Sequence, residues 1–242
     1  MNVVSMGQGP PVVMIHGLLL GSLAQWYFTA APVLAKRHRV LLYDLRGHGR
    51  SHRARSGYDL ATLQGDLAAL LAMEGIEEPV DLVGHSYGGL IALHHALRHP
   101  EGVRRLALLD VPLPPGRAEV FDDALGRSPD ALLELLPERV RADVARGGRR
   151  VRRLLEGLRF LTQDSTLLSD VRAEPDLDDD ALAQVGCPTL LLYGETSGCL
   201  PGAERLVRVL PDARLRTVPG GHFVPVEAPR AMTAHLEEFL DG

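Results

Sequence analysis

The 242-residue sequence lacks long hydrophobic runs and an excess of positive charge. No apolar stretch reaches the roughly 18 to 20 residues that a helix needs to cross a bilayer, so we expect no membrane partner. The net charge is −5 at pH 7, which argues against nucleic acid as a partner. The first residues, Met1 to Met6, lack the charged and apolar regions of a signal peptide, so a cytoplasmic location is expected.

Cysteine is also scarce, with only Cys187 and Cys199. They flank a predicted strand at 189–193, which holds its ends further apart than the roughly 7 Å that a disulfide tolerates. We therefore expect two free thiols, as in a reducing compartment. No histidine or cysteine pair has zinc-ligand spacing with a third ligand in view, so the sequence implies neither a metal nor another cofactor.

What the sequence does have is an alternation of apolar strands and helices. Hydrophobic residues make up 45% of the chain and charged residues 24%, which suits a buried core. Strands are predicted at 11–16, 39–44, 80–85, 104–110, 189–193 and 213–218. Helical periodicity occurs near 22–36, 59–74, 86–99, 202–210 and 227–240. This order predicts an α/β fold, with a mostly parallel sheet and helices on both faces.

A serine stands between one of these strands and the helix that follows it. Residues 84–89 read GHSYGG. Glycines on either side of Ser86 permit a sharp turn, because they lack the Cβ atoms that would clash. The serine then lies at a helix N-terminus, where backbone N–H groups and the helix dipole favour developing negative charge. We interpret Ser86 as a nucleophile; the alternative is a structural turn serine.

Two further motifs make the chain resemble the α/β-hydrolase superfamily over nearly its whole length. Residues 11–18, PVVMIHGL, are similar to the first parallel strand and oxyanion loop of that family. Residues 43–51, YDLRGHGRS, are similar to its structural D-x-R-G-x-G-x-S turn. The resemblance implies an α/β-hydrolase fold, with an oxyanion hole formed by the backbone N–H groups of Leu18 and Tyr87.

The same resemblance points to a histidine near the C-terminus. Residues 218–223, VPGGHF, follow a predicted strand and resemble the loop that carries the family's catalytic histidine. This implies that His222 is the general base. The other nine histidines, His16 and His85 among them, are expected to be solvated or packed rather than catalytic.

The catalytic acid is where the sequence departs from the family. The family pattern places an aspartate three residues after Gly194, but Ser197 occupies that position, and a serine cannot carry the negative charge that an imidazolium needs. Two carboxylates are candidates instead. Asp110 ends the predicted strand after the Ser86 turn, where some members carry their acid, and Glu195 follows Gly194. A third alternative is a dyad of serine and histidine without an acid.

A long segment, 112–186, interrupts the alternation of strands and helices. It contains helical apolar spacing at 131–136 and 153–161, and it resembles the helical cap that covers the active site in this superfamily. We therefore expect an α/β-hydrolase core, 1–111 and 187–242, and a helical cap or lid insertion. The insertion carries Arg139, Arg141, Arg146, Arg149, Arg150, Arg152 and Arg153. A solvated helix face explains these charges, and the alternative is a docking surface for an anionic acyl-carrier or CoA-linked substrate.

Together these residues predict a serine hydrolase that cleaves an ester, thioester or lactone of a small molecule through an acyl-enzyme on Ser86. The candidate pocket walls are Trp26, Tyr27, Cys199 and Phe223. Three alternatives remain at this stage. The first is carbon–carbon bond cleavage, a lyase step or cyclisation on the same fold. The second is a cofactor-free perhydrolase, and the third is a ligand-binding receptor without catalysis.

Overall fold

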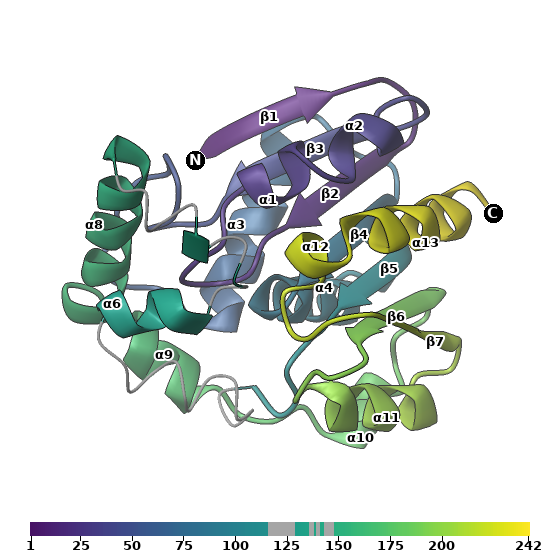
Figure 1. Ribbon diagram of the computed structural model, residues 1–242. Coiled ribbons are helices and arrows are strands. Elements are labelled where there is room, and N and C mark those ends of the chain that lie inside the picture. The colour runs from purple at the N-terminus through teal and green to yellow at the C-terminus, as the bar shows by residue number, and fades with distance from the viewer. Residues whose placement is uncertain (116–128, 136–137, 139–140, 143–147) are drawn as a thin grey trace.

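In the part of the chain that the computed structural model describes, residues 1–115, 129–135, 138, 141–142 and 148–242, seven strands form one sheet (Figure 1). They are β1 (Asn2–Met6), β2 (Pro11–Ile15), β3 (Arg39–Asp44), β4 (Val80–His85), β5 (Val103–Leu109), β6 (Thr189–Gly194) and β7 (Ala213–Val218). Their order is β1-β3-β2-β4-β5-β6-β7, with β1 antiparallel to β3 and every other neighbouring pair parallel. The predicted fold class is confirmed.

The six strands expected from the sequence lie within one residue of their predicted positions, whereas β1 was missed. Its sequence, NVVSM, is short and mostly half-buried, so it shows neither a long apolar run nor a clean alternation. Strand β1 pairs only with β3 at the edge of the sheet, so the pairing that defines it is not local in sequence.

Helices cover both faces of the sheet (Figure 1). One face packs against α3 (Leu60–Met73), α4 (Tyr87–Arg98) and α11 (Leu200–Val209). The other packs against α1 (Ala24–Tyr27), α2 (Ala31–Leu34), α12 (Val224–Glu227) and α13 (Pro229–Asp241). A short 3₁₀ helix, η1 (Pro100–Gly102), leads into β5. None of the described helices is both long and apolar enough to span a bilayer.

The single helix expected near 22–36 is instead two short helices, α1 and α2. The cause is Pro32, which lies in the first turn of α2 and has no N–H to donate to a preceding turn. Trp26 on α1 is fully buried and belongs to the core on this face of the sheet. The apolar periodicity was therefore correct, but the proline divides the segment.

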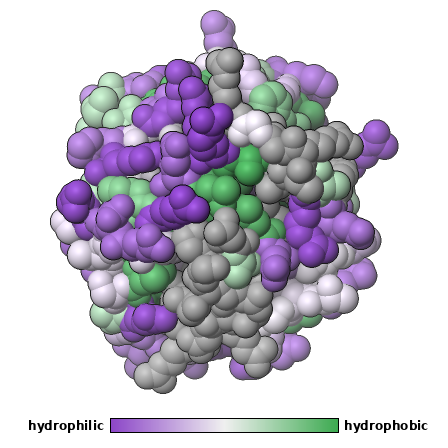
Figure 2. Space-filling model, turned by 60° about the vertical axis from the view of Figure 1, so that its left-hand side comes forward, coloured by the Kyte–Doolittle hydropathy of each residue, from purple (hydrophilic) through white to green (hydrophobic). Residues whose placement is uncertain are grey.

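The segment between β5 and β6 contains helices α6 (Pro129–Leu132), η2 (Leu133–Leu135), α8 (Arg149–Gln163), α9 (Leu167–Ala173) and α10 (Asp179–Leu182). Helices α6, α8 and α9 lie together at one side of the sheet (Figure 1). Figure 2 shows this side of the molecule, where hydrophilic side chains lie beside a smaller apolar area. Position 136 of the helix expected at 131–136, and Arg139 and Arg146, lie outside the described residues.

Polar contacts hold this segment to the loop between β3 and α3. Asp170 accepts the backbone N–H of Tyr58 at 2.9 Å, and Glu174 accepts that of Leu60 at 2.5 Å. Leu161 is 1% exposed and packs within the core. The α8 and α9 helices are therefore packed onto the core by apolar as well as polar contacts.

Two buried histidines bind the loop after β2 to the loop after β3. His16 Nε2 accepts the backbone N–H of Leu45 at 3.0 Å, and His48 Nε2 accepts that of Leu19 at 2.9 Å. The Nδ1 atom of each ring donates to a nearby backbone carbonyl, at 2.7 and 2.8 Å. Burial lowers the pKa of both rings, that of His48 to about 3, so both are neutral at pH 7 and can accept these hydrogen bonds.

We expect the free energy of unfolding to fall as the pH drops from about 6.5 toward 3. In this window the unfolded chain protonates His48 while the folded chain keeps it neutral, so the unfolded state binds more protons. One such histidine contributes a slope of about 1.4 kcal/mol per pH unit. Chemical denaturation between pH 4 and 6.5 should give a shallower slope for His48→Gln than for the parent chain. Parallel slopes would contradict a neutral, buried His48.

Candidate active site

Ser86 lies between β4 and α4 in a turn that requires small neighbours. Its backbone has φ 55° and ψ −128°, a region that residues other than glycine rarely adopt. A Cβ atom on Gly84 would lie 2.4 Å from the Gly88 carbonyl oxygen, and one on Gly88 would lie 2.5 Å from that of Ile15. The two glycines therefore allow the close contacts that place the Ser86 hydroxyl at the N-terminus of α4.

His222 follows β7 and reaches the serine across the carboxyl edge of the sheet. Its Nε2 atom lies 2.9 Å from Ser86 Oγ. A hydrogen bond holds the backbone of His222 in place, because its carbonyl oxygen accepts from His85 Nε2 at 2.8 Å. Burial lowers the pKa of His85 to about 3, so His85 is a neutral donor rather than a second base. The structure thus gives His85 a supporting role.

Asp110 lies on the other side of the His222 ring. Its Oδ1 atom is 2.9 Å from His222 Nδ1, and the aspartate is fully buried. A carboxylate there assigns the proton of the neutral ring to Nδ1, which leaves the Nε2 lone pair directed at Ser86. Like Ser86, Asp110 has a positive φ, of 48°, immediately after its strand. Asp110, His222 and Ser86 therefore form one continuous chain of hydrogen bonds.

Ser197 lies against the same carboxylate, although the family pattern would have an acid in its place. Its hydroxyl donates to Asp110 Oδ1 at 2.5 Å, while the backbone N–H of Gly194 donates to Oδ2 at 2.8 Å. Both oxygens of the buried carboxylate are thus hydrogen-bonded, as a buried charge requires. Glu195 is exposed, and its backbone N–H donates to Val218 O at 2.9 Å. Asp110, and not Glu195, is the carboxylate brought to the Nδ1 atom of His222.

The loop after β2 passes directly over the serine. A Cβ atom on Gly17 would lie 3.1 Å from that of Ser86, so the backbone approaches Ser86 closely. The Leu19 N–H is bonded to His48, whereas within the described part of the chain the Leu18 N–H has no acceptor. Tyr87 is the first residue of α4 and directly follows the serine. Leu18 and Tyr87 thus lie on the two segments expected to provide oxyanion donors.

A cavity of about 410 Å³ opens onto Ser86 and His222, between the oxyanion loop, α1 and α12. Phe223 lines it, as expected, and so does Phe28, which the sequence did not single out. Trp26 lies in the core instead, and Tyr27 is 39% exposed with its ring packed edge-on against Phe28. Their adjacent positions on one short helix explain the error, because a four-residue helix directs neighbouring side chains in different directions.

Cys199 is buried behind the histidine and does not line this cavity. Its Sγ atom is 3.7 Å from His222 Nδ1, and Asp110, Cys199 and His222 each offer a ligand atom within 4.8 Å of the others. Such a group has the donor types of a metal site. However, burial and the Asp110 charge raise the pKa of the Cys199 thiol, and the His222 nitrogen is already bonded to Asp110. A proton on the thiol makes Cys199 a poor ligand.

Comparison with known proteins places the chain in a family. A model of the α/β hydrolase fold matches residues 10–229. The chain is 34% identical to a pimeloyl-[acyl-carrier protein] methyl ester esterase from Chromobacterium violaceum, with 97% of each chain covered. It is 29% identical to a non-heme haloperoxidase from Rhodococcus erythropolis, over 98% of this chain and 94% of the relative.

A solved structure agrees with these sequence matches. A hydrolase from Pseudomonas aeruginosa PA01 superposes with a TM-score of 0.80 at 26% identity, covering 99% of this chain and 94% of that one. The family model, the relatives and the solved structure therefore agree on the family. As its motifs predicted, the chain belongs to the α/β-hydrolase family and is an enzyme of that family.

Proposed function

We propose that the protein is a serine hydrolase that cleaves an ester, thioester or lactone of a small molecule through an acyl-enzyme on Ser86. The observation that carries this proposal is the hydrogen-bond chain from Asp110 through His222 to Ser86, with both ring distances at 2.9 Å. A serine next to a neutral imidazole that is itself oriented by a buried carboxylate is the arrangement that activates a hydroxyl as a nucleophile.

The steps follow from these distances. His222 Nε2 takes the proton of Ser86 as the hydroxyl oxygen attacks the acyl carbon, and Asp110 stabilises the imidazolium that forms. The imidazolium then gives its proton to the leaving alcohol or thiol as the tetrahedral intermediate collapses to the acyl-enzyme. A water molecule deprotonated by the same nitrogen attacks the acyl-enzyme, which releases the acid and restores Ser86.

Oxyanion stabilisation is assigned to the backbone N–H groups of Leu18 and Tyr87. In support, the Leu18 N–H lies on the loop that approaches Ser86, and Tyr87 occupies the first position of α4. The positive end of the helix dipole also favours charge that develops on the carbonyl oxygen. Loss of a single such donor typically costs about 10² to 10³ in kcat.

Several observations support particular substrates, a location in the cell and a second candidate activity for this protein. The relative named as an esterase of pimeloyl-[acyl-carrier protein] methyl ester supports an ester, and it supports an acyl-carrier-linked substrate as one candidate. Arg152 and Arg153 on α8 are exposed, which suits an anionic carrier. Cys187 and Cys199 are free, which suits a reaction in the cytoplasm. The relative named as a haloperoxidase favours perhydrolysis of the same acyl-enzyme as a second candidate activity.

We propose further that residues 112–186 act as a cap that selects the substrate. Asp170 and Glu174 of this segment bind the backbone N–H groups of Tyr58 and Leu60. We expect changes in the cap to alter substrate selection while leaving Ser86, His222 and Asp110 in place.

A fluorophosphonate should label Ser86 covalently, because His222 makes its hydroxyl nucleophilic. Ser86→Ala should abolish labelling, and both Ser86→Ala and His222→Ala should lower kcat on p-nitrophenyl esters by about 10⁴ or more. Mass spectrometry of the labelled peptide identifies the site, and Ser56→Ala, an exposed serine, serves as the matched control. Full turnover by Ser86→Ala would rule out the acyl-enzyme.

Asp110→Asn should lower kcat by about 10² to 10⁴, since an amide no longer stabilises the imidazolium. Glu195→Gln should cost less than about tenfold, because this side chain is exposed and Asp110 already faces the His222 ring. The sharper test adds Ser197→Asp to Asp110→Asn, which returns a carboxylate to the neighbouring strand end and should recover part of the loss. Steady-state kinetics of these variants measure the effect on kcat. If Asp110→Asn were as active as the parent chain, the mechanism would be a dyad of Ser86 and His222 without an acid.

Substitutions in the cap should change selectivity more than labelling. Leu132→Ala in α6 removes a fully buried side chain from the cap, and it should shift the ratio of kcat/KM between short and long acyl esters by several-fold. The rate of Ser86 labelling should remain within about twofold, as for the exposed control Met73→Ala. If activity fell equally on all esters and the labelling of Ser86 were also lost, the segment would be needed for folding rather than for substrate selection.

A further inference from the structure

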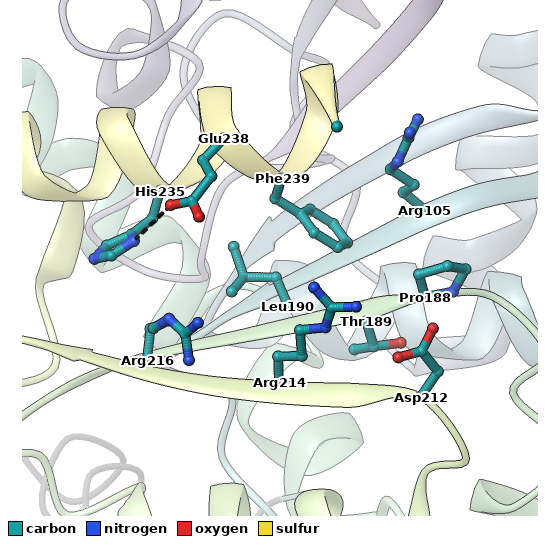
Figure 3. A pocket seen from close by; sticks show the side chains of 11 residues that line it. Arg105, Pro188, Thr189, Leu190, Asp212, Arg214, Arg216, His235, Glu238 and Phe239 are labelled. Atoms are coloured by element: carbon teal, nitrogen blue, oxygen red, sulfur yellow. Dashed lines mark ion pairs between the residues drawn. The ribbon is translucent and has the colours of Figure 1, made fainter.

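Another cavity, of about 370 Å³, opens at the far end of the same sheet (Figure 3). It lies near the amino-terminal ends of β5, β6 and β7 and beneath α13, whereas Ser86 and Asp110 lie at the carboxyl ends of the strands. The proposed hydrolase chemistry makes no use of it. Three arginines line it: Arg105 from β5 and Arg214 and Arg216 from β7.

The two arginines of β7 are exposed on the edge strand of the sheet. Arg214 is paired in register with Leu190, and Arg216 with Leu192, so all four side chains share one face of the sheet. On that face Leu190 and Leu192 belong to the core that α13 covers. At β7 the core thus gives way to two guanidinium groups beside the helix.

These three arginines form no ion pair with a described residue, although Arg216 Nη1 donates to the backbone carbonyl of Leu215 at 3.2 Å. Within the described part of the chain, no carboxylate lies within 4.0 Å of the guanidinium nitrogens of Arg105, Arg214 or Arg216. Ion pairs do hold the arginines at 37, 39, 46, 104 and 205. Protection of an exposed sheet edge explains charges on β7, but not Arg105, which lies on an interior strand.

Acidic groups also border the cavity. Asp212 and Glu238 both line it, and the Glu238 carboxylate, 78% exposed, lies 3.9 Å from His235 Nδ1 (Figure 3). Gly242, the last residue of the sequence, lines it as well. The carboxylates should oppose anion binding, so the three arginines have to outweigh them.

We propose that this cavity is a binding site for a small phosphate-bearing anion. Guanidinium groups bind phosphate through paired N–H donors, and three of them line this cavity. The volume falls within the range of small-ligand sites, which begin at about 300 Å³. Inorganic phosphate, pyrophosphate and a phosphorylated metabolite share this chemistry. The site is separate from Ser86, so it does not depend on the proposed hydrolase activity.

Calorimetry and thermal unfolding at constant ionic strength test the site with inorganic phosphate, pyrophosphate, glycerol 3-phosphate and acetate. Pyrophosphate at about 100 times its Kd should raise the Tm by about 5 °C or more, and acetate should not. Tighter binding of glycerol 3-phosphate than of either inorganic anion would point to a phosphorylated metabolite, and the reverse to the free ions. Responses to all four anions no larger than that to chloride would overturn the proposal.

Variants separate this site from general charge effects. Arg214→Gln with Arg216→Gln should weaken pyrophosphate binding at least tenfold, and Asp212→Asn should strengthen it several-fold. Arg208→Gln removes an exposed arginine of α11 that does not line the cavity, and it should leave binding unchanged. The Tm of each variant without anion verifies folding. Equal binding by the double variant and by Arg208→Gln would refute the site.

Discussion

The constraint on which the proposed site depends is the sharp turn of the backbone at the ends of two adjacent strands. Strands β4 and β5 pair in register, with His85 opposite Leu109, so the next residues, Ser86 and Asp110, leave the sheet at the same level. Both have positive φ, and both backbone N–H groups remain bonded to the neighbouring strand, at 2.8 and 3.0 Å. The sheet therefore sets the distance between Ser86 and Asp110, and His222 bridges them from the loop after β7.

Much of this arrangement could be predicted from the sequence because its determinants are local. The GHSYGG turn and the six parallel strands carry their signals within a few residues, as glycine spacing and apolar runs. The choice between Asp110 and Glu195 was different. It depended on which carboxylate meets the His222 ring, a contact across 112 residues that only the packing of β5 beside β6 decides. The support of His222 by His85 is hidden for the same reason, since a backbone carbonyl carries no residue signature.

Three neutral histidines bind segments together in the described structure. His16, His48 and His85 are all buried, all have lowered pKa values, and each hydrogen-bonds to a backbone group of another segment. The rings of His16 and His48 accept and donate at once, which satisfies two buried backbone groups without burying a charge, whereas His85, at the end of β4, bonds to the described residues through Nε2 alone. In the sequence these residues are easily mistaken for catalytic or surface histidines, because their role is set by burial alone.

The contact between Ser197 and Asp110 has a consequence for where a carboxylate can be placed. Position 197, after β6, lies one hydrogen bond, 2.5 Å, from the carboxylate that faces His222. The ends of two neighbouring strands, β5 and β6, thus border a single place beside the Nδ1 atom of His222. A carboxylate from either strand end could occupy this place without relocation of His222 or Ser86. Ser197 is small enough to admit the side chain of Asp110 and polar enough to bind it.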